Sequence, residues 1–277
     1  MMQTPIVFFG SSNFVLPILE ELKNNFSLSL VVTTEQKASD AVPQYCQKNN
    51  IPYVSISNFS EELEKKLLAI GAPVGVLADF GIIVSKKIIN IFPKGIINIH
   101  PSLLPTYRGA TPVQTALLDG LNETGVSIML LDEKLDSGPI LFQQTETILP
   151  TETAKSLYEK LFTIGAKKLP QIIAQYVDNK LQPTPQTNEN ISYTKTLTRE
   201  SGYIDANHPP QNLQNMIKAY FPWPGVWTKM NLFGKEKMVK LLPNNMLQVE
   251  GKKPMTTKDF LNGYPDTKEI LQKLGLL

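Results

Sequence analysis

Short runs of β-branched and aromatic residues alternate with helix-like segments along the first half of the chain, and this alternation limits the possible folds most strongly. The runs predict strands at 6–9, 30–32, 74–78 and 95–100. Apolar spacing predicts helices at 17–23, 41–49, 61–70 and 85–91. Units of this kind build a mostly parallel sheet covered by helices on both faces. The sequence therefore predicts an α/β fold with a doubly wound, Rossmann-like sheet, whose sites lie beyond the carboxyl ends of its strands.

Beyond residue 110 the patterns predict a helix starting at Pro112 and two strands at 126–131 and 140–145, followed by a long helix at 153–176. Pro170 marks a kink in this helix or a break between two segments. A polar stretch with two prolines then follows and predicts a linker.

The predicted domains are a catalytic domain at 1–178, a linker at 179–200 and a reduced, β-rich domain at 201–277. The last of these contains short strands and one helix near 211–220, which is consistent with a small, truncated β-barrel-like domain.

Composition limits the class of protein. The N-terminal residues lack the basic region and cleavage motif of a signal peptide, and no apolar run reaches the roughly 18 residues of a membrane span. Cys46 is the only cysteine, which excludes an intramolecular disulfide and a thiolate metal cage. We therefore expect a cytoplasmic protein with no membrane contact, acting as a monomer.

Charge is distributed unevenly along the chain. The net charge is only +2, but residues 191–277 carry 12 basic against 7 acidic side chains. This excess fits either phosphate contacts or an ordinary lysine-rich surface facing water.

Polar residues gather at the end of the predicted strand 95–100. Side chains alternate along a strand, so Asn98 and His100 point the same way while Ile97 and Ile99 pack into the sheet. The prolines that follow fix the backbone of the next loop. Asp136 lies in a tight turn rich in serine, glycine and proline. Taken singly, such a histidine or aspartate is commonly structural, so spacing alone leaves both alternatives open.

A second candidate lies after the first strand, where Gly10 and Ser11 form a short polar turn. Its backbone N–H groups could face an anion at the start of the next helix. An ordinary strand-to-helix turn explains the same residues, and the glycine patterns of dinucleotide and nucleoside triphosphate sites are absent from the sequence.

Three motifs together are recognisable. They are Asn98-Ile-His-Pro-Ser-Leu-Leu-Pro-Thr-Tyr-Arg-Gly109, then Glu123-Thr-Gly-Val126, then Leu135-Asp-Ser-Gly138. Their combination resembles the signature of the formyltransferases that use 10-formyltetrahydrofolate. The combined pattern is far more specific than any one short motif.

The resemblance implies that Asn98, His100 and Asp136 are the catalytic residues. An amine would attack the formyl carbon, and positioned donors would stabilise the oxyanion that forms. The imidazole and the carboxylate would relay the proton from the attacking nitrogen to the departing one, and Asp136 would orient His100. The resemblance implies no metal.

It also implies a binding site for the formyl donor, 10-formyltetrahydrofolate. The loop residues Ser102, Leu103, Leu104 and Pro105 would contact the folate. An apolar slot for the pterin ring would be bordered by Leu77, Asp79, Phe80, Gly81 and Ile82, although a core strand ending in a loop explains this stretch equally well. For the acceptor, we assign Gly10, Ser11 and Arg108, where Arg108 clamps an anionic substrate or the loop itself.

Three later segments, 191–197, 217–227 and 251–263, resemble the branch of this family that formylates methionyl-tRNA. The resemblance implies initiator methionyl-tRNA as the partner. Two features depart from that branch. The loop 33–40 is short, and the positive charge of Lys37 is opposed by the negative charges of Glu35 and Asp40. The C-terminal domain is also shortened, because only about fifty residues follow Trp227 and a complete barrel needs more.

Two alternatives therefore stay open. An amino-sugar nucleotide N-formyltransferase would use the same folate donor and read a nucleotide with its C-terminal part. A folate-binding or tRNA-binding protein without turnover is a different class, against which the presence of Asn98, His100 and Asp136 argues.

Overall fold

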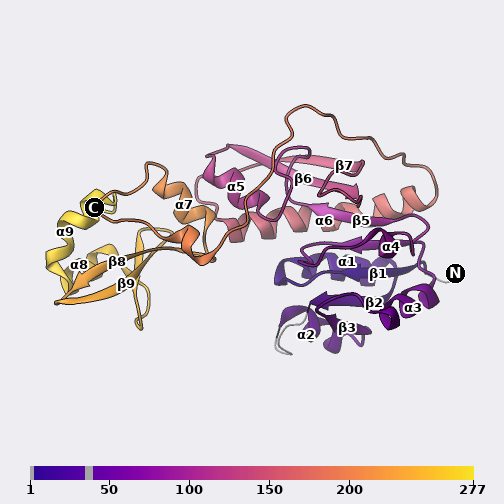
Figure 1. The fold of residues 1–277 in the computed structure, drawn as a ribbon, viewed down its shortest axis with the longest axis horizontal. Coiled ribbons are helices and arrows are strands. Elements are labelled where there is room, and N and C mark those ends of the chain that lie inside the picture. Colours follow the sequence, from indigo (N-terminus) through magenta and orange to yellow (C-terminus); the bar gives the residue numbers. More distant parts are fainter. Residues whose placement is uncertain (1–2, 35–39) are drawn as a thin grey trace. The chain divides into compact units, whose positions relative to one another are not determined.

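The computed structural model describes residues 3–34 and 40–277 (Figure 1). Its strands are β1 (Pro5–Phe9), β2 (Ser27–Thr34), β3 (Tyr53–Ile56), β4 (Val74–Leu77), β5 (Ile96–His100), β6 (Glu123–Leu130), β7 (Ile140–Thr147), β8 (Val226–Leu232), β9 (Lys235–Leu242), β10 (Met246–Val249) and β11 (Met255–Thr256). Its α-helices are α1 (Leu16–Asn25), α2 (Ala41–Lys48), α3 (Glu61–Ile70), α4 (Lys86–Ile89), α5 (Pro112–Leu118), α6 (Ala154–Val177), α7 (Leu213–Ala219), α8 (Thr257–Gly263) and α9 (Lys268–Lys273). Short 3₁₀ helices are η1 (Asn13–Val15), η2 (Arg199–Gly202) and η3 (Pro265–Thr267).

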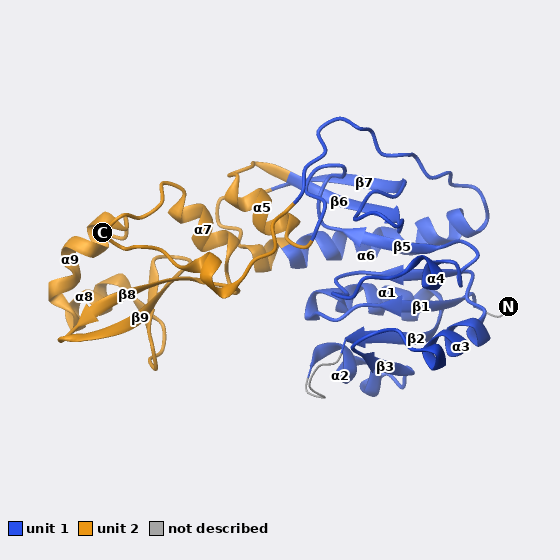
Figure 2. Cartoon of the chain, in the orientation of Figure 1, with its two compact units in different colours: residues 1–109, 124–147, 158–193 blue, residues 110–123, 148–157, 194–277 orange. Residues whose placement is uncertain are grey.

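The chain forms two compact units (Figure 2). Unit 1 contains residues 1–109, 124–147 and 158–193, and unit 2 contains residues 110–123, 148–157 and 194–277. Each unit is therefore built from segments that are separated in the sequence.

Unit 1 contains a seven-stranded sheet in the order β3-β2-β1-β4-β5-β6-β7. The neighbours from β3 to β5 pair in parallel, and β6 runs antiparallel to β5. The chain passes from β1 to β2 on one side and returns to β4 on the other, which is the reversal of a doubly wound sheet. The predicted Rossmann-like, mostly parallel sheet is confirmed.

Alternation along the strands divides the core of unit 1 between the two faces of the sheet. Ile6 and Phe8 of β1 pack in one buried cluster with residues of α1, α2 and α6. Val7 and Phe9 pack in another with residues of α3 and α4. Helices therefore cover both faces, as the period-two pattern of the strands requires.

Helix α6 closes one face without interruption. It runs continuously through Pro170, so of the two predicted alternatives, a kink or a break, the break is excluded. Gly165 of the same helix faces β5, because a Cβ there would lie 2.8 Å from the Cγ2 of Ile99. The absent side chain lets the helix approach the strand that carries the polar pair.

The sheet of unit 2 is antiparallel, with four strands in the order β11-β10-β9-β8. Strands β8 and β9 form a hairpin in which Leu232 pairs with Lys235, and both turn residues, Phe233 and Gly234, have positive φ. This is the backbone twist that a two-residue hairpin favours. The predicted small β-rich region is confirmed as this four-stranded sheet, which is followed by α8 and α9.

Some local predictions differ from the structure. Strand β3 was not predicted, and only Ile56 of its four residues is buried. Helix α5 begins at Pro112 as predicted, and the hydroxyl of Thr111 before it donates to the carbonyl of Lys195 and does not cap the helix. The loop residues Glu35 and Lys37 lie outside the described residues. No helix within the described ranges is long and apolar enough to cross a membrane.

The core of unit 1 makes a testable prediction about Cys46 of α2. The side chain is fully buried, and desolvation raises the pKa of the thiol to about 11. At pH 8 only about one thiol in a thousand would be ionised, and the ionised form is the one that reacts. We expect Ellman's reagent to label no thiol in the native protein and one per chain in urea. Rapid labelling of the native protein would contradict this packing.

Candidate active site

Strand β5 carries the two polar side chains predicted to point the same way. It lies between β4, in parallel, and β6, antiparallel, with Leu77 opposite Asn98 and Ser127 opposite His100. Ile97 and Ile99 are buried in the cluster under α6. Asn98 and His100 are only 6% and 5% exposed on the other face. Buried polar groups require partners, so the groups around them define the site.

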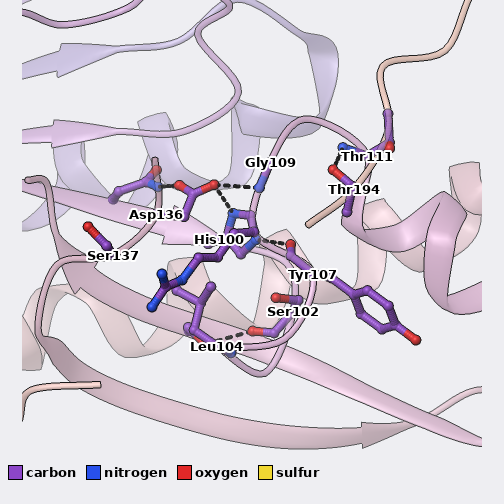
Figure 3. Close-up of polar contacts among 12 residues, drawn as sticks. His100, Ser102, Leu104, Tyr107, Gly109, Thr111, Asp136, Ser137 and Thr194 are labelled. Atoms are coloured by element: carbon purple, nitrogen blue, oxygen red, sulfur yellow. Dashed lines mark hydrogen bonds and ion pairs between the residues drawn. The ribbon is translucent and has the colours of Figure 1, made fainter. Parts of the chain in front are cut away.

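The carboxylate of Asp136 is the group that meets both of them, and Figure 3 shows it beside His100 and Gly109. Its Oδ1 lies 3.5 Å from the Nδ2 of Asn98, and its Oδ2 lies 3.7 Å from the Nδ1 of His100. Oδ2 also accepts a hydrogen bond of 2.7 Å from the backbone N–H of Gly109. The three residues named from the sequence therefore converge from β5 and from the loop after β6.

The tautomer of His100 follows from its other neighbour. The Nε2 atom lies 2.9 Å from the carbonyl oxygen of Tyr107, which can only accept a hydrogen bond. Nε2 therefore carries a hydrogen, and in the neutral ring the lone pair of Nδ1 faces the site and Asp136. A neutral His100 can accept a proton at Nδ1, and the carboxylate of Asp136 would then stabilise the imidazolium.

The contacts of Asp136 with Asn98 and His100 are long. Distances of 3.5 and 3.7 Å do not make strong direct hydrogen bonds, so a substrate atom placed beside these groups can compete for their donors and acceptors. The arrangement thus combines an amide donor, a proton acceptor and a carboxylate around one small space. It is suited to a reaction in which an oxyanion forms and a proton is relayed.

The loop after β5 forms a fixed wall beside these groups. Ser102 is fully buried, and its hydroxyl donates to the carbonyl of Thr106 over 2.7 Å. The carbonyl of Leu104 accepts a bond from Gln143, and its N–H donates to Ser127. Leu103 packs against Gly125, where a Cβ would lie 2.4 Å from the leucine Cδ2. Only Leu103 and Pro105 of the four predicted folate contacts keep partly exposed surfaces.

The second predicted folate segment follows β4. Phe80 is buried in the core, whereas Leu77 and Ile82 are partly exposed, and Asp79 and Gly81 are exposed. Desolvation raises the pKa of the Asp79 carboxyl although its surface is accessible, and a hydrogen bond from Ser12 opposes the rise.

The turn of Gly10 and Ser11 uses its donors within the fold. The N–H of Gly10 donates to Val32, and the N–H of Ser11 donates to Asp79. The Ser11 hydroxyl donates to the carbonyl of Phe80 and accepts from the N–H of Thr34. Neither backbone N–H is left for an anion, so the turn joins β1, β2 and the loop after β4.

Arg108 lies in the loop after β5 and is 6% exposed. Its guanidinium donates to the side-chain oxygen of Gln186, through Nε over 3.2 Å and through Nη2 over 2.7 Å. It also lies over the ring of Tyr193. Of the two functions considered for Arg108, these contacts match the one in which it clamps the loop.

Some groups at the site were missed from the sequence. Tyr107 and Gly109 contribute backbone atoms, which no residue type reveals, and Gln186 is fifty positions from Asp136 along the chain. Across the part of the chain that the structure describes, no group of three His, Cys, Asp or Glu side chains could hold a metal ion.

Comparison with known proteins shows the family to which the chain belongs. A family model described as formyl transferase matches residues 4–173, and one described as formyl transferase, C-terminal domain, matches residues 196–247. A methionyl-tRNA formyltransferase of Roseiflexus sp. (strain RS-1) is 39% identical over 80% of this chain and 72% of its own. One from Thermodesulfovibrio yellowstonii is 30% identical over 95% of this chain and 96% of its own.

Solved structures share the fold at lower identity. A 4-N formyltransferase from Francisella tularensis superimposes with a TM-score of 0.69 at 16% identity, over 87% of this chain and 98% of that chain. A sugar N-formyltransferase from Shewanella sp. gives a TM-score of 0.68 at 18% identity over the same shares. These likenesses support the fold. Because a family model covers most of the chain and relatives match over most of their own length, the chain belongs to the formyl transferase family.

Proposed function

We propose that this enzyme transfers the formyl group of 10-formyltetrahydrofolate to the amino group of methionyl initiator tRNA. The observation that carries the proposal is that Asn98, His100 and Asp136 converge. The carboxylate of Asp136 lies 3.5 Å from the amide nitrogen of Asn98 and 3.7 Å from the imidazole of His100. The identity to methionyl-tRNA formyltransferases over most of the chain supports the acceptor. Such a reaction takes place in the cytoplasm.

Each of the three side chains has a distinct task in this proposal. The neutral amine of the acceptor attacks the formyl carbon, and a C–N bond forms while the carbonyl oxygen becomes an oxyanion. Asn98 donates from Nδ2 to this oxyanion. His100 accepts the proton of the attacking nitrogen at Nδ1 and passes it to the departing folate nitrogen as the old C–N bond breaks. Asp136 stabilises the imidazolium between these two steps.

The surroundings of the site fit a folate. Ile83, in the loop after β4, is 93% exposed, and Leu135, next to Asp136, is 61% exposed. Two apolar side chains displayed on these loops offer surface that a flat heteroaromatic ring can cover. Gly81 has a positive φ, and no atom lies within 4 Å of the position of an added Cβ, so the backbone there is open to a ligand. We propose that Leu77, Asp79 and Ile82 border the same slot.

Unit 2 has a surface suited to RNA, which we call the basic hollow. Arg199, Lys229 and Lys237 line it, together with the ring of Trp227 and the acidic Glu236 and Glu250. The guanidinium of Arg199 lies over the indole of Trp227, and Tyr203 packs against the same ring. Cations of this kind supply phosphate contacts, whereas the ring of Trp227 is only partly exposed between Arg199 and Tyr203. The hollow therefore supports a tRNA acceptor.

The direct test supplies 10-formyltetrahydrofolate with one acceptor at a time and follows the release of tetrahydrofolate by absorbance. Methionyl initiator tRNA forms one arm, and a panel of amino-sugar nucleotides forms the other. We expect turnover with the tRNA alone. Turnover with the sugars alone would replace the proposed acceptor, and binding without turnover in either arm would end the proposal of an enzyme.

One prediction of the proposed function concerns His100. Replacing it with alanine removes the proton acceptor, and general acid–base catalysis contributes about 10²–10⁴-fold. We expect kcat of His100→Ala to fall by that factor in the formyl-transfer assay. His208→Ala is the matched control, because the only other histidine of the chain is exposed and pairs with Asp205 in unit 2. Full activity of His100→Ala would rule out the proposed relay.

The second prediction concerns the basic hollow. Lys237→Glu reverses a charge that would face RNA phosphates, so KM for methionyl-tRNA should rise several-fold while KM for the folate donor stays unchanged. The slope of log KM against log salt concentration should decrease by about 1, which corresponds to the loss of one phosphate contact. Lys258→Glu, the same change on exposed α8, serves as the control. Equal effects of both variants would indicate a general charge effect and no RNA contact at the hollow.

A further inference from the structure

The segment Thr184–Tyr193, expected to be a linker, is attached to unit 1 at both of its ends. At one end Thr184 exchanges backbone hydrogen bonds of 2.7 and 2.8 Å with Ile140, at the start of β7. At the other end the N–H of Arg108 donates to the carbonyl of Ser192, and the N–H of Tyr107 donates to the Ser192 hydroxyl. We call this segment the strap. It is part of unit 1 (Figure 2).

Gln186 lies within the strap and contacts the loop of Asp136. Its side-chain nitrogen donates to two carbonyl oxygens, those of Asp136 and Gly138, each over 2.8 Å. Its side-chain oxygen accepts the two bonds from the guanidinium of Arg108. All four contacts involve the amide group of one side chain. The two carbonyl oxygens require the N–H donors of this amide, and the guanidinium requires its oxygen acceptor.

The loop held by Gln186 has a demanding conformation. Asp136 has a φ of 47°, in the left-handed region that non-glycine residues seldom adopt. A Cβ on Gly138 would lie 1.9 Å from the carbonyl oxygen of Leu130, so the chain passes too close to β6 for any side chain. Such a backbone persists where surrounding contacts determine it.

Arg108 has an unusual environment for a buried cation. In the ranges that the structure covers, no carboxylate forms an ion pair with its guanidinium, which is met by the amide oxygen of Gln186 and the ring of Tyr193. A buried charge is costly unless it is hydrogen-bonded. Arg108 therefore holds the oxygen of Gln186, and this leaves the nitrogen of the same amide directed at the Asp136 loop.

We propose that Gln186 is a positioning residue for Asp136, which holds the backbone of its loop so that the carboxylate faces Asn98 and His100. The inference rests on the function proposed above and assigns a task to the strap within the same site. Gln186 acts through Asp136 and through no contact of its own with the reacting atoms. The strap is thus a part of the catalytic apparatus.

Gln186→Glu tests this with almost no change of shape. The carboxylate keeps the two bonds from Arg108 and gains an ion pair, so the strap stays attached. It has no hydrogen to donate, and its second oxygen faces the carbonyls of Asp136 and Gly138. We expect kcat to fall by about 10–100-fold, because misplacing a catalytic group by 1 Å can cost that much. KM for the folate donor should change less than about twofold, since the slot is not touched.

Gln182→Glu is the matched control, because it adds the same charge four positions away at an exposed residue bonded only to the carbonyl of Asn179. We expect it to leave kcat unchanged. If Gln182→Glu lowers kcat as much as Gln186→Glu does, the charge and not the lost donors explains the effect, and the proposal is wrong.

The double variant separates positioning from general support. If Gln186 works only through Asp136, then adding Gln186→Glu to Asp136→Asn should lower kcat no further. If the double variant loses kcat by the product of the two single losses, the proposal is overturned.

A crystal structure of Gln186→Glu gives a readout that needs no activity, because the 2.7 Å bond between Asp136 and the Gly109 N–H should be lost. If that bond stays intact, the inference fails even where the proposed function holds. If the wild-type chain transfers no formyl group, the proposed function fails by itself.

Discussion

The buried carboxylate of Asp136 is the group on which the rest of the site depends. A carboxylate that is only 9% exposed must be hydrogen-bonded or paired to be tolerated. Its partners come from the strand β5, through Asn98 and His100, and from the loop that follows it, through Gly109. None of these partners is adjacent to Asp136 in the sequence. The burial of one charge therefore requires that the sheet, the loop after β5 and the loop after β6 all adopt their places together.

The topology of the sheet makes this meeting difficult to achieve. Strand β6 runs antiparallel to β5, with Ser127 opposite His100 and Leu130 opposite Ile97, so it carries the chain away from the carboxyl end where His100 lies. The loop after β6 must turn back before its side chain can reach Asn98 and His100. The left-handed conformation of Asp136 and the side-chain-free Gly138 are the means of this reversal. Backbone strain in this loop is thus a consequence of an antiparallel strand beside a parallel sheet.

The sequence predicted those features that have a local period, and it missed those that depend on distant backbone. Alternation was enough to place Asn98 and His100 on one face of β5, with Ile97 and Ile99 in the core on the other. The alternation of strand-like and helix-like segments was enough to predict the doubly wound sheet, although it did not predict the short strand β3. Pro170 predicts a kink or a break, and the helix α6, which packs against the sheet, continues through it without a break. No pattern indicates that a carbonyl of Tyr107 fixes the tautomer of His100, or that Gln186 reaches across to the loop of Asp136.

The unequal lengths of the contacts around Asp136 indicate how a rigid site can still admit a reaction. One short bond, from the Gly109 N–H to Oδ2, and the two bonds from Gln186 to the loop backbone fix the position of the carboxylate. The contacts to Asn98 and His100, at 3.5 and 3.7 Å, are too long to satisfy those groups fully. A protein that closed these gaps would be more stable but would have used the donors and acceptors that the reacting atoms need. The short bonds therefore orient the carboxylate, and in the proposed reaction a tetrahedral intermediate would replace the long contacts to Asn98 and His100.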